Sequence, residues 1–164
     1  MQSKSILCVA FLGLIVSLAL GSDKSNSERD SLKGIKEMDV VVEHFSDDQK
    51  KLGFNTDSFK TQVELRLRHS TIKITENADP FLYININVHL IEGQRVLPIE
   101  GQRVLLNIEV RFEQPARIIA NDKIMLVTTW NKGMVGIGNL QWTKEIVDEL
   151  VDKFINDYLA ANQK

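Results

Sequence analysis

Two long segments of the chain alternate between apolar and polar residues, and this alternation restricts the fold more than any other feature. The apolar residues of the first segment are Leu82, Ile84, Ile86, Val88 and Leu90. Those of the second segment are Val104, Leu106, Ile108, Val110 and Phe112. Successive side chains of a β-strand point to opposite faces of its sheet. The sequence therefore predicts two long antiparallel strands with one covered face and one open face.

Three shorter segments predict the remaining strands. Val40-Val41-Val42 is a β-branched run that suits a buried strand, and Ile72 and Ile74 indicate a short second one. Residues 124–130 predict a third, with Ile124, Leu126, Thr128 and Trp130 on one side. Pro115 is expected to end or bulge the long strand that precedes it.

Two longer helices and one short helix or turn are predicted. Ser46 begins the short one and Gly53 ends it. After the capping residue Asn55, the apolar residues Phe59, Val63 and Leu67 recur at helical spacing. A strand through Val63, Leu65 and Leu67 is the alternative; the cap and Phe59 favour the helix, with Leu65 pointing away from the apolar stripe. A final helix is predicted from about residue 140 to 160 by the stripe Ile146, Val147, Leu150, Val151, Phe154 and Tyr158.

Together these elements predict a single α+β domain. We expect a two-layer sandwich in which an antiparallel or mixed sheet of four to five strands packs its apolar face under two helices. The chain has 164 residues, enough for one stable core.

The first residues have the features of a secretory signal. Lys4 supplies a positive charge, an apolar stretch follows over residues 6–20, and Ala19-Leu20-Gly21 offers small residues for cleavage. We therefore expect residues 1–21 to be a signal peptide, 22–34 a flexible leader and 35–164 the domain. The expected location is exported, with the periplasm preferred and secretion as the alternative, and without a stable membrane span after cleavage.

Several sequence segments resemble a family of uncharacterised exported bacterial proteins. They are Gly34-Ile35-Lys36, Val40-Val41-Val42, Glu64-Leu65-Arg66-Leu67-Arg68, Thr129-Trp130, Gly136-Ile137-Gly138 and the tail 154–162. The order of the predicted elements also looks loosely like the amino-terminal domain of TolB and the curli-assembly lipoproteins. This resemblance implies an envelope interaction module and no particular site residues.

The candidate binding face is the polar side of the first long strand. Its residues are Tyr83, Asn85, Asn87 and His89. Such a row could bind a ligand or a partner, and a solvated face that pairs with Glu109, Arg111 and Glu113 explains it equally well.

No other pattern in the sequence indicates catalysis, a metal or a cofactor. His44, His69 and His89 have no metal-site spacing, and Cys8, the one cysteine, lies in the signal segment. The glycine-rich residues 133–138 lack a nucleotide-binding pattern and are expected to form a flexible connection to the last helix. The formal net charge of −2 gives no basic excess for nucleic acid.

A tandem repeat separates the two long strands. Residues 91–97 read IEGQRVL and recur at residues 99–105. An even period keeps the faces of a strand in register, so the repeat either lengthens the hairpin or bulges out as a loop.

From these observations we expect a non-catalytic protein-interaction module of the bacterial cell envelope. Its partner would be an envelope protein or a second copy of the chain. The alternative is a small-ligand binder or enzyme that uses the polar face of the first long strand.

Overall fold

A computed structural model describes residues 26–90 and 103–163 of the chain. Their main feature is a five-stranded sheet with the order β2-β1-β3-β4-β5. The strands are β1 (Glu37–Val42), β2 (Lys73–Ile74), β3 (Phe81–Leu90), β4 (Val104–Ile118) and β5 (Lys123–Gly138). The helices are α2 (Asp47–Lys51), α3 (Thr56–His69) and α4 (Leu140–Asn162), and a further helical segment spans residues 26–30.

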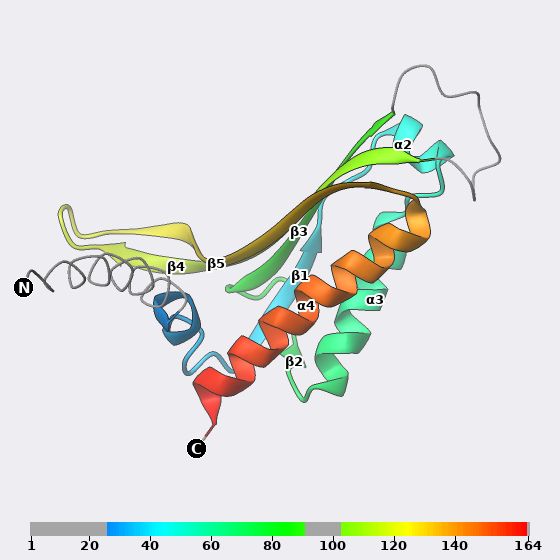
Figure 1. Cartoon of the computed structure of the whole chain (residues 1–164). Helices are drawn as coiled ribbons and strands as arrows, with labels where there is room; N and C mark the ends of the chain where they lie inside the picture. The colour runs from blue at the N-terminus through cyan, green and yellow to red at the C-terminus, as the bar shows by residue number, and fades with distance from the viewer. Residues whose placement is uncertain (1–25, 91–102, 164) are drawn as a thin grey trace, which may run out of the picture.

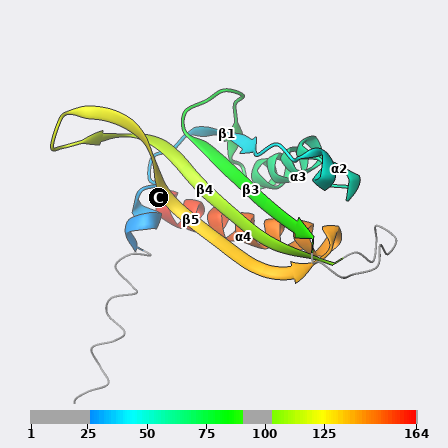
Figure 2. The same ribbon diagram turned by 90° about the horizontal axis from the view of Figure 1, so that it is seen from above.

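The sheet is mixed and its helical layer lies on one face. Strand β1 is parallel to both β2 and β3, whereas β3–β4 and β4–β5 are antiparallel. Helices α3 and α4 lie side by side against the same face of the sheet in both views (Figures 1 and 2). The predicted α+β sandwich with a mixed sheet and two covering helices is confirmed.

The two long strands pair with the predicted faces. Leu82 of β3 is opposite Phe112 of β4, and Ile86 is opposite Ile108. All four are buried under the helices, so we call this the inner face and the opposite one the outer face. The alternation in the sequence therefore correctly predicted which side of each strand is buried.

Local capping explains where α2 and α3 begin. Ser46 and Gln49 form a reciprocal capping box at α2. At α3, the Asn55 side chain accepts a hydrogen bond from the Ser58 N–H, and Phe59, Val63 and Leu67 are buried. Leu65 is 49% exposed, as the helical spacing predicts and the strand alternative does not.

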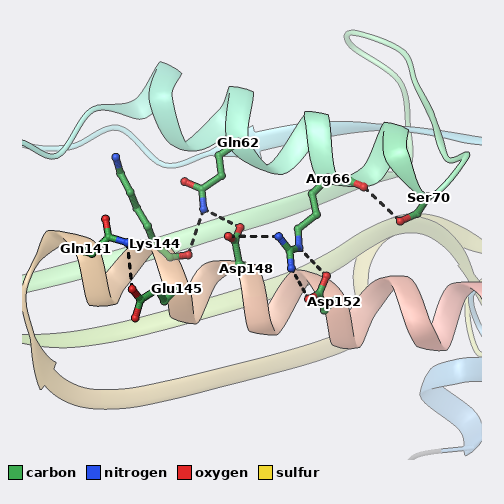
Figure 3. Close-up of polar contacts among 8 residues, drawn as sticks. All are labelled: Gln62, Arg66, Ser70, Gln141, Lys144, Glu145, Asp148 and Asp152. Atoms are coloured by element: carbon green, nitrogen blue, oxygen red, sulfur yellow. Dashed lines mark hydrogen bonds and ion pairs between the residues drawn. The ribbon is translucent and has the colours of Figure 1, made fainter.

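A polar network joins α3 to α4 (Figure 3). Arg66 binds Asp152 through two hydrogen bonds of 2.6 and 2.5 Å, and its other terminal nitrogen lies 3.4 Å from Asp148. Gln62 donates to the Asp148 carboxylate at 2.7 Å and to the Lys144 carbonyl at 3.2 Å. These contacts fix the two helices against each other above the sheet.

The glycine-rich segment before α4 was expected to be a flexible connection, and that prediction is wrong. Residues 133–138 are the second half of β5 and pair with β4, where Gly136 is opposite Leu106 and Gly138 opposite Val104. The glycines leave space for Trp142 of α4. A Cβ atom would lie 2.6 Å from its ring at Gly136 and 2.2 Å from it at Gly138.

Pro115 does not end β4, and the expected single side of residues 124–130 is also wrong in part. The strand continues to Ile118, with Pro115 opposite Leu126. A bulge separates the pairs Phe112–Trp130 and Glu113–Thr128, so Thr129 is an extra residue in β5. The bulge places Trp130 on the inner face, while Ile124, Leu126 and Thr128 lie on the outer face.

Part of the expected flexible leader is packed against the domain. Leu32 is completely buried, and the Arg29 guanidinium pairs with the Asp157 carboxylate at 2.9 Å. The Gly34 N–H donates to the Asn162 side chain at 2.8 Å. Residues 26–34 therefore differ from the expectation, because one apolar side chain is buried in the core and several polar groups find partners in α4.

Some expectations fall outside the described residues. They concern the signal peptide over 1–21, the leader residues 22–25, and the part of the repeat that covers residues 91–102. These stay predictions.

Candidate functional site

The predicted polar row lies on the outer face of the sheet, away from the helices. Tyr83, Asn85, Asn87 and His89 alternate with the buried residues of β3. Asn87 and His89 are exposed, and Tyr83 and Asn85 are half-buried. The sheet thus brings all four predicted residues to one surface.

Neighbouring strands extend this row across the outer face. In β4, Arg111 is opposite Tyr83, Glu109 is opposite Asn85, and Asn107 is opposite Asn87. The expected pairing of the row with Glu109 and Arg111 is therefore present at the level of register.

Tyr83 and Arg111 form the most closely packed part of the face. The Arg111 guanidinium carbon lies 4.9 Å from the centre of the Tyr83 ring, in a cation–π arrangement. Glu109 and Glu113 lie 3.9 and 3.7 Å from the guanidinium. Its Nε is buried and has no hydrogen-bond partner among the described residues. The pKa of the Tyr83 hydroxyl is raised, mainly by partial burial and to a smaller extent by hydrogen bonding to the Glu43 carboxylate.

The asparagines hydrogen-bond to one another and to a carboxylate. The Asn87 amide donates to the Asn85 side-chain oxygen at 2.5 Å, and the Asn85 amide in turn donates to Glu43. The contact between the two asparagines therefore runs along β3, whereas the contact with Glu43 joins β3 to the residue that follows β1. His89 lies opposite the half-exposed apolar residue Leu105, at the far end of the row.

The three histidines are exposed and lie on different parts of the fold. His44 follows β1, His69 ends α3, and His89 is near the end of β3. Within residues 26–90 and 103–163, no group of three His, Cys, Asp or Glu side chains is placed to hold a metal ion. In the same part of the chain, no helix has the length and apolar character needed to cross a membrane.

A second surface, which the sequence did not predict, is the end of the β4–β5 hairpin. Phe81 begins β3 and is opposite Glu113, so residues 114–127 of the hairpin continue beyond the rest of the sheet. We call residues 114–127 the arm; it projects away from both helices (Figures 1 and 2). Within the described residues, no third strand pairs with either edge of the arm.

Large apolar side chains of the arm are exposed. The exposed fraction is 97% for Ile119, 73% for Ile124, 51% for Met125 and 50% for Leu126. On the outer face, Ile124 and Leu126 are opposite Arg117 and Pro115. Exposed apolar side chains grouped on one projecting element are typical of a binding surface.

Polar contacts fix the base of the arm. The Gln114 side chain donates to the Thr129 hydroxyl at 2.7 Å and to the Ser31 carbonyl at 3.1 Å. Lys132, in the part of β5 next to the arm, forms a 2.6 Å ion pair with Glu28. Residues 26–34 thus brace the point where the arm leaves the sheet.

One signal in the sequence marks the arm. Asn121-Asp122 is a turn dipeptide between the apolar segments 118–119 and 124–127. The structure places a turn there, with Asp122 at φ 58° and its N–H bonded to the Ile118 carbonyl. The expectation that Pro115 would end or bulge the strand concealed this hairpin.

Comparison with known proteins found similar structures but no related sequence family. No family model matches the chain, and no curated protein has a significant sequence match to it. The PelC dodecamer from Paraburkholderia phytofirmans is 11% identical over 78% of this chain and 86% of its own, with a TM-score of 0.35. A minor lipoprotein from Acinetobacter baumannii is 14% identical over 78% and 93%, with a TM-score of 0.36.

Rare lipoprotein B from Shewanella oneidensis is a third similar structure. It is 15% identical over 76% of this chain and 92% of its own, with a TM-score of 0.21. All three TM-scores lie below 0.5, so the likeness carries no conclusion about what this chain binds.

Proposed function

We propose that this protein is a non-catalytic, exported interaction module that binds another protein through the arm. The observation that supports the proposal is the projection of a two-stranded ribbon that pairs with no third strand among residues 26–90 and 103–163 and that exposes Ile119, Ile124, Met125 and Leu126. The proposed export rests on the signal sequence expected over residues 1–21.

The arm offers two kinds of contact to a partner. Its open strand edges present backbone N–H and C=O groups that can pair with a strand of the partner. Its apolar side chains add the burial that stabilises such pairing, about 25 cal/mol for each square ångström removed from water. Backbone pairing and apolar burial need no catalytic group.

Crosslinking in the host cell tests this proposal. A tagged chain with its signal intact is crosslinked and the captured proteins are identified by mass spectrometry. We expect one partner chain, either an envelope protein or a second copy of this chain, to be crosslinked to the wild type and lost from the double variant Ile124→Lys/Leu126→Lys.

A matched control is available on the same strand. Val135 and Ile137 are 69% and 50% exposed on the outer face of β5 but lie outside the arm. The variant Val135→Lys/Ile137→Lys should capture the partner as the wild type does. Undiminished capture by the arm variant would contradict the proposal.

A second candidate function uses the polar outer face to bind a small ligand. The buried Arg111 Nε without a hydrogen-bond partner among the described residues is the observation that favours it. In that case Asn87→Ala combined with His89→Ala abolishes ligand binding and leaves stability nearly unchanged, because both side chains are exposed. Unchanged ligand binding by this variant would exclude the polar face as the binding site.

A further inference from the structure

We infer that the occupant of the arm is the arm of a second copy of the chain, so that two chains pair antiparallel along β5. This inference rests on the proposed function, since it names the partner of the same surface. Strand β5 ends the sheet order and is its long open edge, with 16 residues against two in β2 at the other edge.

The arm portion of β5 lacks the features that keep an edge strand from pairing. Proteins protect such edges with charges, proline or short strands. Residues 123–129 contain no proline, and Lys123 at one end is their single charged residue. The proline lies in β4, and the bulge lies at Thr129 at the base of the arm, so residues 123–128 of this edge contain neither.

A two-fold axis through Met125 gives a self-complementary register. Residues directly opposite each other in an antiparallel pair share a face of the sheet. With Met125 opposite itself, Ile124 of one chain is opposite Leu126 of the other, and both belong to the outer face. Lys123 is then opposite Val127, so no like charges oppose each other. The product is a four-stranded sheet, β4-β5-β5-β4, made from two arms.

The charges of the arm favour a protein partner over a lipid bilayer. Arg117 and Asp122 form an ion pair at the turn, and Lys123 follows directly. A bilayer would have to take up these charged groups before the apolar residues 124–127 reached it. Pairing along the edge instead leaves the turn in water.

Sedimentation of the purified full chain over a range of concentrations tests the inference. We expect a monomer–dimer equilibrium for the wild type and for Val135→Lys/Ile137→Lys. The variant Ile124→Lys/Leu126→Lys places two lysine pairs across the two-fold axis and should weaken dimerisation by about tenfold or more. Since both replaced side chains are exposed, its far-UV circular dichroism and thermal unfolding should match those of the wild type. A dimer unaffected by these lysines would overturn the inference.

Disulfide trapping tests the register independently. In a Cys8→Ser background, Met125→Cys becomes the only thiol, and the proposed axis brings the two copies of residue 125 together. A disulfide needs Cα atoms about 4.4–6.8 Å apart. We expect oxidation to yield a covalent dimer for Met125→Cys but not for Val135→Cys. Equal trapping at both positions would overturn the register.

The remaining outcomes separate this inference from the proposed function. A monomer at every concentration, with an envelope protein captured in cells through the arm, would overturn the inference and leave the proposed function standing. A monomer that captures nothing through the arm would overturn both. The wild type could instead be a monomer that co-sediments with phosphatidylglycerol–phosphatidylethanolamine vesicles, with co-sedimentation lost in Ile124→Lys/Leu126→Lys. That result would show that the arm binds lipid and would overturn both the inference and the proposed function.

Discussion

The indole ring of Trp142 lies against Gly138, so close that a Cβ atom on Gly138 would stand 2.2 Å from the ring. Trp142 is in the first turn of α4, and Gly138 is the last residue of β5. The contact therefore sets how the final helix leaves the edge strand. It also explains why a strand this long contains glycine at positions 136 and 138.

Replacing Gly138 by alanine should destabilise the protein by about 1–3 kcal/mol, because the added methyl group overlaps the indole. Urea unfolding followed by far-UV circular dichroism measures the loss. In a Trp142→Ala background the same replacement should cost much less, because the clash is gone. Equal costs in both backgrounds would show that Trp142 is not the cause.

Replacing Asp157 by alanine should destabilise the protein by about 1–3 kcal/mol, because the N–H of the buried Trp130 loses its acceptor. Asp157 accepts hydrogen bonds from Trp130 Nε1 and from Arg29 Nε, each at 3.0 Å. Arg29→Ala is the control. It removes a 41%-exposed ion-pair partner and should cost less than about 1 kcal/mol. A larger loss for Arg29→Ala than for Asp157→Ala would contradict this account.

Arg66→Lys should loosen α4 from α3 nearly as much as Arg66→Ala, because lysine cannot form the paired hydrogen bonds to Asp152. The Arg66 side chain is 37% exposed, so each loss should be about 1 kcal/mol or less and should shrink in high salt. Arg68→Ala, which removes a pair within α3 alone, is the matched control and should be nearly neutral. Thermal unfolding at low and high salt measures these differences, and full rescue by lysine would refute the role given to the paired geometry.

Both tyrosines of the chain should titrate above the ordinary tyrosine value of about 10. Burial raises the pKa of Tyr158, and burial together with the Glu43 carboxylate raises the pKa of Tyr83. A folded-state pKa above the unfolded value gives stability that is complete below about pH 10 and is lost as the pH rises through the folded pKa. Ultraviolet absorbance titration measures the ionisation, and Tyr83→Phe assigns the two groups. A tyrosine that ionises below 10 in the folded protein would contradict the prediction.

The fold class could be predicted because the alternating apolar residues of β3 and β4 and the apolar stripe of α4 are buried in the same core. Caps at Ser46 and Asn55 added the helix starts. These signals are local, and tertiary packing did not override them.

The end of β5 could not be predicted, because its structure depends on contacts with distant residues. Glycines 133, 136 and 138 are poor strand formers alone, and only pairing with β4 and the approach of Trp142 make a strand there. Pro115 suggested a strand end, yet β4 passes through it. The polar row itself could be read from residues 83–89, whereas the hydrogen bonds from Asn85 to Glu43 and the stacking of Arg111 required the register of three strands.

The hydrogen bonds that join residues 32–35 to α4 have a consequence for the order of synthesis. Tyr158 donates to the Ile35 carbonyl, and Asn162 contacts both Gly34 and Leu32. The polypeptide leaves the ribosome from residue 26 toward residue 162, so these partners of the earliest described residues are made last. A nascent chain therefore cannot close its structure before translation reaches the end of α4.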